Sequence, residues 1–240
     1  MRLIRAGNPS EWTGPTGNNT WLLEGPPAIL IDAGVGNAEH VAAIANALDG
    51  VELAVVLLTH GHVDHVAGVP ALLDRWPGAV VRGGGVGVPL TDGELLTAGA
   101  TELEALHTPG HAPDHFCFLD RQTRDVYCGD LARRGGTVVI PASRGGDLRE
   151  YLASLERIRD LRPARLLPAH GPIVDDPAKL IEEYLAHRAE RSRQICAALA
   201  EGYTTAEDIV ARIYPQLPAS LRPAAVETVR AHLAVIGEGG

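Results

Sequence analysis

The chain has 240 residues, 45% hydrophobic and 21% charged, which allows one large domain, or a medium domain with a small appendage, to bury a sizeable core. Its formal net charge of −9 argues against broad electrostatic attraction to nucleic acid or to an anionic membrane. No apolar run approaches the roughly 18 residues that a membrane-spanning helix needs. Residues 1–9 lack the apolar core of a signal peptide. We therefore expect a soluble, cytoplasmic protein that does not bind membranes.

The first 170 residues alternate between patterns typical of strands and of helices. Short apolar runs bounded by turn residues predict strands at 19–23, 28–31, 53–58, 79–82, 94–97, 101–107, 115–119, 125–128 and 165–168. Apolar residues at helical spacing predict helices at 38–48, 66–76 and 147–161. The run 53–58 is continuous and apolar, so we expect it to be a buried central strand. By itself, this alternation indicates an α/β or an α+β domain.

The character of the sequence changes after Pro172. Helices are predicted at 177–200, 204–213 and 223–236, with Thr205 as a helix N-cap, and no strong strand signal follows. We therefore expect a catalytic domain over residues 1–177 and a small helical domain over residues 178–240. From His187 onward the chain carries as many arginines as acidic residues, so this second domain lacks the basic excess of a tight nucleic-acid binder.

The three cysteines form no CxxC pair, and one would stay unpaired in any disulfide scheme. We expect Cys117, Cys128 and Cys196 to be buried thiols in a reducing compartment rather than part of a disulfide framework.

The main chemical signal is the run Thr59-His60-Gly61-His62-Val63-Asp64-His65, directly after the predicted central strand. Three further candidates follow predicted strand ends beside small residues, namely His111, Asp130 and His170. Imidazole and carboxylate groups together suit borderline divalent metals, zinc foremost. Ligands from separate strand ends can converge on one rim of a sheet sandwich, so these residues predict a metal site there.

This set, His-x-His-x-Asp-His followed by Gly-His, Gly-Asp and a late His, resembles the metallo-β-lactamase superfamily. The resemblance implies an α+β fold, a four-layer αβ/βα sandwich, with two zinc ions that activate a bridging hydroxide for hydrolysis. It implies that one ion is held by His60, His62 and His111, and the other by Asp64, His65 and His170. Asp130 would bridge the two ions, with Asp64 and Asp130 acting as the catalytic carboxylates.

Several other side chains have two interpretations. Asp32 resembles the early strand-end aspartate of the superfamily and is expected to orient a metal-binding imidazole rather than to serve only as a turn carboxylate. His115 is either a proton donor or substrate contact in the pocket, or a hydrogen-bonded strand histidine. Trp12 either grips substrate from a mobile loop or simply packs. The pair Arg133-Arg134 is expected to be solvated, although it could bind an anionic group.

Three histidines are not assigned to the site. His40, His187 and His232 fall in predicted helices, and we expect them to be solvent-facing or half-buried.

The C-terminal residues are similar to the winged-helix module of the β-lactamase-like-protein-2 group. The similarity rests on His187-Arg188-x-x-Arg191, Tyr203-Thr204-Thr205, Leu221-Arg222-Pro223 and Ala231-His232-Leu233, and on Gly17-Asn18-Asn19-Thr20-Trp21-Leu22 near the N-terminus. In the last segment, Asn18 and Trp21 replace the Thr and Tyr of the group. Some members of this group cleave single-stranded RNA, and relatives hydrolyse thioesters of carrier-bound polyketides.

The resemblance therefore leaves two kinds of substrate. We expect hydrolysis of an ester-type bond (an acyl ester, thioester or lactone) in a small acyl substrate, with the neutral C-terminal domain walling the pocket. The alternative is cleavage of short single-stranded RNA. The oligomeric state stays open.

Other classes of protein compete with a hydrolase. Diiron redox members of the superfamily have a glutamate in place of His62 and normally carry a flavin domain, so metal analysis and an iron absorbance band would identify them. A glutathione-type thioester is a further possible substrate. A transcription factor with a degenerate metal domain is disfavoured because all seven candidate ligands are present. An antibiotic hydrolase is disfavoured because we see no export signal.

Overall fold

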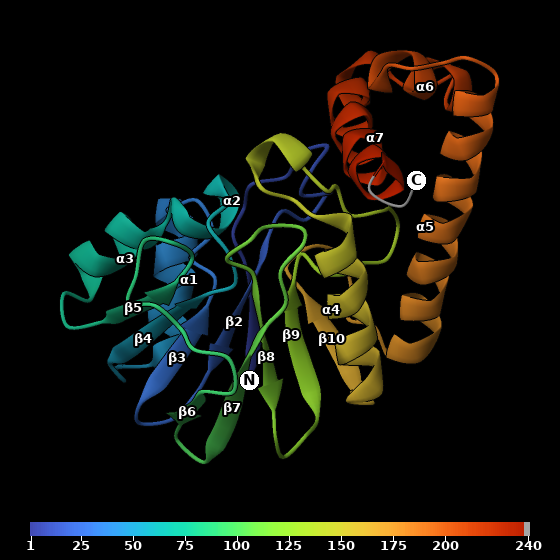
Figure 1. Cartoon of the computed structure of the whole chain (residues 1–240). Helices are drawn as coiled ribbons and strands as arrows, with labels where there is room; N and C mark the ends of the chain where they lie inside the picture. Colours follow the sequence, from blue (N-terminus) through green and yellow to red (C-terminus); the bar gives the residue numbers. More distant parts are fainter. Residues whose placement is uncertain (238–240) are drawn as a thin grey trace.

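The computed structural model describes residues 1–237 and consists of two five-stranded sheets packed face to face (Figure 1). The first sheet has the order β1-β2-β3-β4-β5, with β1 and β2 antiparallel to their neighbours and β3, β4 and β5 parallel to one another. Its strands are β1 (Arg2–Arg5), β2 (Asn19–Leu23), β3 (Ala28–Ile31), β4 (Leu53–Leu58) and β5 (Val80–Gly83).

The second sheet has the order β10-β9-β8-β7-β6 and is antiparallel except for the parallel pair β9 and β10. Its strands are β6 (Leu95–Ala98), β7 (Thr101–His107), β8 (Phe116–Asp120), β9 (Asp125–Gly129) and β10 (Arg165–Pro168). The inner faces of the two sheets share one apolar core, which includes Trp21, Ile29, Ile31, Leu57, Leu103, Phe118, Tyr127 and Leu167.

Helices cover both outer faces and complete four layers (Figure 1). On the first sheet lie α1 (Ala38–Leu48), the short α2 (Val63–Val66) and α3 (Val69–Arg75). On the second sheet lie α4 (Leu148–Asp160) and the first half of α5 (Pro177–Ala200). A 3₁₀ turn, η1 (Ala142–Arg144), precedes α4. The α+β class and the four-layer sandwich are confirmed by this arrangement.

The C-terminal part is helical, with short connections, from residue 178 to residue 237. The second half of α5 packs with α6 (Ala206–Ile213) and α7 (Arg222–Gly237) around a small core of its own, with Ile195, Ile209 and Val229 at its centre. A 3₁₀ turn, η2 (Ala219–Leu221), joins α6 to α7. Residues 238–240 of the predicted second domain lie outside the described residues. Helix α5 thus belongs to two cores at once, that of the second sheet and that of the C-terminal helices.

Most predicted elements are observed within one or two residues, but two differ. Strand β1 was not predicted, because Arg2–Arg5 is short and half polar. The single helix expected at 66–76 is interrupted before Val69, where Gly68 approaches the backbone so closely that an added Cβ would lie 2.1 Å from the Ala33 oxygen. Within the described residues, no helix combines the length and the apolar character that crossing a membrane requires.

Burial corrects three expectations. His40 and His232 are 2% and 0% exposed, neither solvent-facing nor half-buried, because helical spacing alone does not tell which helix face meets a neighbouring element. His187 is exposed, as expected. Cys117 and Cys128 are buried free thiols, whereas Cys196 is an exposed one.

Candidate metal centre

The seven predicted ligands lie on loops and a short helix that follow strand ends. His60 comes two residues after β4, and His62 is the N-cap of α2, which carries Asp64 and His65. His111, Asp130 and His170 follow β7, β9 and β10. The structure brings all seven together in two neighbouring groups, although the first and the last are 110 positions apart in the chain.

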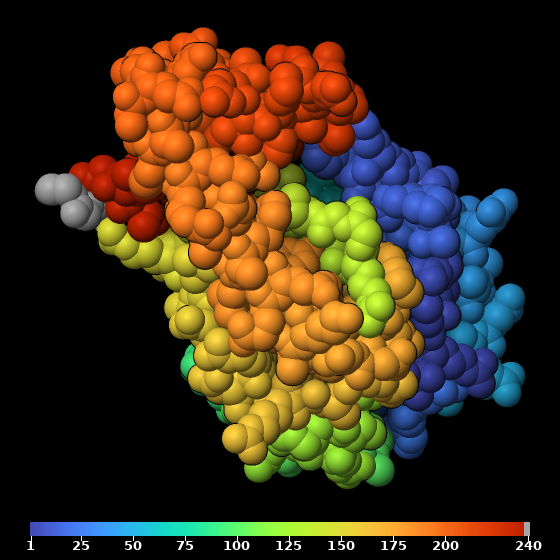
Figure 2. All heavy atoms as spheres, turned by 90° about the vertical axis from the view of Figure 1, so that its right-hand side faces the viewer, coloured from blue at the N-terminus to red at the C-terminus, as the bar shows by residue number. Residues whose placement is uncertain are grey.

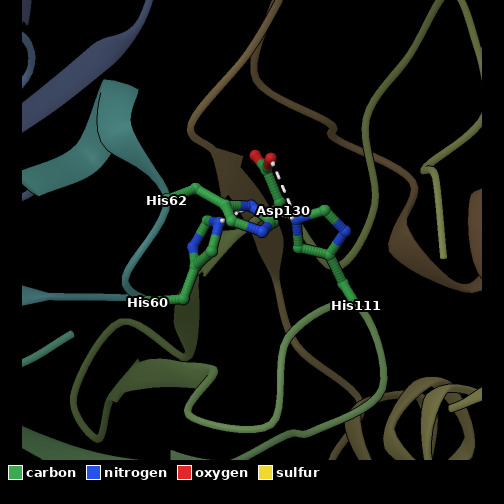
Figure 3. A group of neighbouring side chains, drawn as sticks. All are labelled: His60, His62, His111 and Asp130. Carbon is green, nitrogen blue, oxygen red and sulfur yellow. Dashed lines mark hydrogen bonds and ion pairs between the residues drawn. The ribbon is translucent and has the colours of Figure 1, made fainter. Parts of the chain in front are cut away.

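The first group consists of His60, His62, His111 and Asp130, whose ligand atoms all lie within 4.8 Å of one another (Figure 3). The Nδ1 atom of His62 lies 2.8 Å from Nε2 of His60 and 3.0 Å from Nε2 of His111. Three imidazole nitrogens thus meet at one point, with the carboxylate of Asp130 3.6 Å from Nε2 of His111. Such nitrogen-rich sets with one carboxylate suit zinc and similar divalent ions.

The second group consists of Asp64, His65 and His170. Oδ2 of Asp64 lies 3.5 Å from Nε2 of His65 and 3.4 Å from Nε2 of His170. Asp130 lies between the groups, because its Oδ1 is 3.2 Å from His170 and its Oδ2 is 3.8 Å from His65. A carboxylate in this position can contact ligand atoms of both groups.

The chemistry of these atoms fits divalent cations. His65 Nε2 is buried and has no hydrogen-bond partner, which is costly unless another species binds it. Burial and the neighbouring His65 lower the pKa of His60 well below its ordinary value, and burial together with His111 lowers the pKa of His62 to about 4. Their rings are therefore neutral at pH 7, as metal binding requires. Although burial opposes it, His170 and His65 hold the pKa of Asp130 well below its ordinary range, so this carboxylate is ionised.

Buried groups orient the imidazoles. Asp32, which is 2% exposed, accepts from Nδ1 of His65 at 2.9 Å, as the sequence predicted, and also from the backbone and hydroxyl of Thr59. The hydroxyl of Thr59 lies 3.1 Å from Nδ1 of His60. Both histidines consequently direct Nε2 toward the cluster.

His115 is fully buried, and its ring centroid lies 5.2 Å from that of His60. Its Nε2 accepts from the backbone N–H of Asp130 at 3.1 Å, and its Nδ1 lies 2.9 Å from the hydroxyl of Thr108. Burial and His111 lower the pKa of His115 to about 3, so the ring is neutral. Both nitrogens are engaged, which favours the hydrogen-bonded alternative over direct contact with substrate.

One contributor to the site escaped the sequence analysis. Asn18 is fully buried, and its Nδ2 donates to Oδ2 of Asp64 at 3.0 Å. Its own Oδ1 accepts from Nδ2 of Asn8 at 2.7 Å. The sequence offered one signal for this role, because Asn18 replaces the Thr that the β-lactamase-like-protein-2 group has at this position of residues 17–22.

The rim of the centre is formed partly by the loop that carries Trp12. Trp12 is 50% exposed, and its carbonyl accepts from the guanidinium of Arg133 at 2.7 Å. The neighbouring Glu11 accepts from the hydroxyl of Ser220 at 3.1 Å, so this loop touches the C-terminal helices as well.

Comparisons with known proteins agree with this geometry. The sequence model described as "Metallo-beta-lactamase superfamily" matches residues 13–96 and 78–170, and the one described as "Beta-lactamase associated winged helix domain" matches residues 205–234. The chain is 33% identical over 244 residues to a "Beta-lactamase-like protein 2 homolog" of Caenorhabditis elegans, covering 95% of this chain and 80% of that protein. It is 30% identical over 246 residues to an "Atrochrysone carboxyl ACP thioesterase" of Aspergillus fumigatus, covering 92% and 76%.

The fold has a close counterpart among solved structures. A metallo-β-lactamase family protein from Thermus thermophilus superposes with a TM-score of 0.83 at 23% identity, covering 100% of this chain and 93% of that one. The match of fold and of C-terminal module, over almost the whole chain, leads to one conclusion. The chain belongs to the metallo-β-lactamase superfamily and is a hydrolase of that family, with a C-terminal winged-helix-type module.

Proposed function

We propose that the protein is a dinuclear zinc hydrolase that cleaves an ester-type bond, with acyl thioesters as the foremost substrate class. His60, His62 and His111 would hold one ion, Asp64, His65 and His170 the other, and Asp130 would lie between them. When bound, such ions lower the pKa of water and polarise a substrate carbonyl oxygen. The observation that carries this proposal is the convergence of all seven candidate ligand side chains on one rim of the sandwich.

The chain's own residues have distinct tasks in this proposal. Asp130, ionised and held through its backbone by His115, would keep the two ligand groups in register and orient the attacking water. Asp64 would supply the carboxylate of the second group, and the hydrogen bond from Asn18 would hold its Oδ2 in place. His115 would act as a positioning residue, because neither of its nitrogens is free for substrate.

Two features favour an acyl substrate over single-stranded RNA. A relative across most of this chain is named as a thioesterase of an acyl carrier protein. The segment from His187 onward, which would have to supply a nucleic-acid-binding face, contains six arginines and six acidic residues. The proposed reaction adds water across the thioester, so that the carbonyl carbon gains an oxygen, the C–S bond breaks and the sulfur leaves with a proton.

The test is to compare zinc-loaded wild type with Asp130→Asn on an acyl-thioester, a lactone and a short single-stranded RNA. Metal content is measured on the same samples by mass spectrometry. We expect thioester turnover by wild type and a loss of about a hundredfold or more in the variant, because ligand and orienting roles are removed together. Asp160→Asn, an exposed carboxylate at the end of α4, is the matched control.

The outcomes separate the candidates. RNA cleavage by wild type without thioester or lactone turnover would overturn the acyl assignment in favour of a phosphodiesterase. Equal activity of wild type and Asp130→Asn would overturn the metal-centred reaction itself. Iron with a visible absorbance band, in place of zinc, would favour a redox member.

A further inference from the structure

Two adjacent asparagines, Asn18 and Asn19, are fully buried where strand β2 begins. A buried side-chain amide is costly unless its N–H and C=O groups are hydrogen-bonded, so the partners of these two amides are informative. Successive side chains of extended backbone point to opposite sides, so the two amides reach different parts of the chain. Asn18 donates to the candidate ligand Asp64, whereas Asn19 binds the backbone on either side of another candidate ligand, His170.

The side chain of Asn19 spans the loop that carries His170. Its Nδ2 donates to the carbonyl of Pro168 at 2.8 Å and to that of Gly171 at 2.9 Å. Its backbone N–H donates to the carbonyl of Ala169 at 2.7 Å. The residues immediately before and after His170 are therefore both fixed to the start of β2.

The ring of His170 depends on this backbone for its position. Its Nδ1 is buried and makes no hydrogen bond within residues 1–237. By contrast, Nδ1 of His65 bonds to Asp32, and Nδ1 of His111 bonds to a backbone carbonyl. With no partner on Nδ1, the orientation of the His170 ring is set by the loop that Asn19 holds.

Asn18 acts on a different ligand of the second group. Its Nδ2 donates to Oδ2 of Asp64 at 3.0 Å. The amide of Asn18 is itself held by Asn8, which donates to its Oδ1 at 2.7 Å and accepts from its backbone N–H at 2.9 Å. This reciprocal pair keeps Nδ2 of Asn18 directed at the carboxylate of Asp64.

The two asparagines thus connect both halves of the sandwich at one point. Asp64 lies on α2, after a strand of the first sheet, whereas His170 follows β10 of the second sheet. Asn18 also forms an isolated antiparallel bridge with His170. Figure 2 shows the blue N-terminal segment lying against yellow-green and orange segments from the second half of the chain.

The first ligand group is supported differently. Within the described residues, no hydrogen bond joins the side chain of Asn18 or Asn19 to any of its three histidines. Its imidazoles are oriented by the hydroxyl of Thr59 and by the carbonyl of Val139. A change at either asparagine should therefore affect the two groups unequally.

We propose that Asn18 and Asn19 are positioning residues for the second metal ion, and that together they set the geometry of its ligand group. Asn18 holds the carboxylate of Asp64, and Asn19 holds the loop of His170. Removing either amide frees one ligand of the second group and leaves the first group in place, so the second ion is lost selectively. The inference rests on the ligand assignment made in the proposed function.

The test measures each metal position alone. In His111→Ala the remaining ion is bound by the second group, and in His170→Ala by the first group. Competition with a chromogenic chelator gives the zinc affinity of each, without any need for turnover. Asn19→Asp is then added to both backgrounds, because aspartate keeps the size of the side chain and its contact with Arg5 but loses both donated hydrogen bonds.

The expected result is a loss confined to one background. Asn19→Asp should lower the zinc affinity about tenfold in His111→Ala and leave it unchanged in His170→Ala, because groups that orient a ligand change affinity by about this amount. Asn18→Ala should give the same pattern, since it removes the amide that holds Asp64. Its result decides the proposal if Asn19→Asp does not fold.

The matched control is Asn37→Asp. The Nδ2 atom of Asn37 also donates to two backbone carbonyls, those of Ala6 and Gly7, at 2.9 and 3.0 Å. The substitution therefore removes the same kind and number of hydrogen bonds away from the ligand groups, and it should change neither zinc affinity. Melting temperatures check that every variant is folded at the temperature of the measurement.

Each remaining outcome has a distinct meaning. Equal losses of affinity in both backgrounds would show that the asparagines only stabilise the fold, and unchanged affinity in both would show that they do not hold the ligands. Either result overturns the proposal. If His111→Ala and His170→Ala each keep the metal content of wild type, the ligand assignment fails, and with it the proposed function, whatever the asparagine variants do.

Discussion

The Nδ1 atom of His111 lies 2.7 Å from the carbonyl oxygen of Val139, and this hydrogen bond ties a proposed metal ligand to a segment held by the C-terminal helices. The buried guanidinium of Arg188, on α5, donates to the neighbouring carbonyl of Val138. On α7, Glu227 accepts from the backbone N–H of Ser143 at 2.7 Å. The module after residue 178 therefore contributes indirectly to the orientation of His111.

Loosening this segment should weaken metal binding. The double variant Glu227→Ala/Thr228→Val removes the carboxylate that binds Ser143 and the hydroxyl that accepts from the backbone N–H of Ile140 at 3.4 Å. We expect the zinc affinity to fall about tenfold, because groups that orient a ligand typically change affinity by this amount. Competition with a chromogenic chelator measures it.

A matched control separates an effect on the orientation of His111 from a general loss of stability of the C-terminal helices. Thr205→Val removes the N-cap of α6, which accepts from Asp208 N–H at 3.1 Å, and so destabilises the same module without touching residues 138–143. Its zinc affinity should equal that of wild type. If Glu227→Ala/Thr228→Val binds zinc as tightly as Thr205→Val does, the C-terminal helices do not orient His111.

Removing one ligand from each group should reveal the two metal positions separately. His111→Ala and His170→Ala should each reduce the metal content by about one ion per chain, because each removes an imidazole ligand from one of the two groups. Plasma mass spectrometry on dialysed protein gives the count. His107→Ala, a half-buried histidine outside both groups, is the control, and a wild-type metal content in both ligand variants would contradict the assignment.

His232 should make the fold sensitive to acid. Burial, together with Arg188 and Arg191, lowers the pKa of His232 to about 3 from an ordinary value of 6.5. Above pH 6.5 the ring is neutral in both the folded and the unfolded chain, so His232 does not lower the free energy of unfolding. Below pH 6.5 the unfolded chain takes up a proton that the folded chain does not, so the free energy of unfolding falls by about 1.4 kcal/mol per pH unit.

The variant His232→Leu should flatten this dependence between pH 6.5 and 5, measured by urea unfolding. Ser192→Ala removes the hydroxyl that lies 3.0 Å from Nδ1 of His232 but keeps the imidazole, so its slope should match wild type. Metal-linked effects are common to all three proteins and cancel in the comparison. Identical slopes for His232→Leu and wild type would refute this origin of acid sensitivity.

Gly110 sets the position of His111 through its backbone. Its φ is +124°, and a Cβ would lie 2.2 Å from the backbone nitrogen of Tyr151 on α4. Gly110→Ala should therefore lower the free energy of unfolding by about 2–3 kcal/mol and reduce metal content. Gly50→Ala is the comparison, because Gly50 has a φ of +86° with nothing within 4 Å, so only backbone strain of about 1 kcal/mol is expected. Chemical denaturation of both variants decides whether close packing matters at Gly110.

Much of the site could be predicted because its ligands carry a local signal. His60, His62, Asp64 and His65 lie in one short motif, and His111, Asp130 and His170 each follow a recognisable strand. Strands β3, β4 and β8 were visible because they are buried over most of their length and form nearly continuous apolar runs.

The residues that support the ligands left no such signal. Val139 acts through its backbone carbonyl, which any residue would offer. Asn18 meets Asp64 across 46 positions, and Arg188 meets Val138 across 50, so only the folded chain pairs them. The burial of His40 and His232 likewise depends on which elements pack against their helices.

The distribution of the ligands along the chain has a consequence for biosynthesis. His60, His62, Asp64 and His65 belong to the first half of the sandwich, whereas His111, Asp130 and His170 come from the second. A nascent chain that has emerged only as far as α3 has ligands from one sheet alone and neither group complete. The proposed metal centre can therefore be completed only after His170, which follows β10, has left the ribosome and both halves have docked, so we expect both ligand groups to be complete only once the sandwich has assembled.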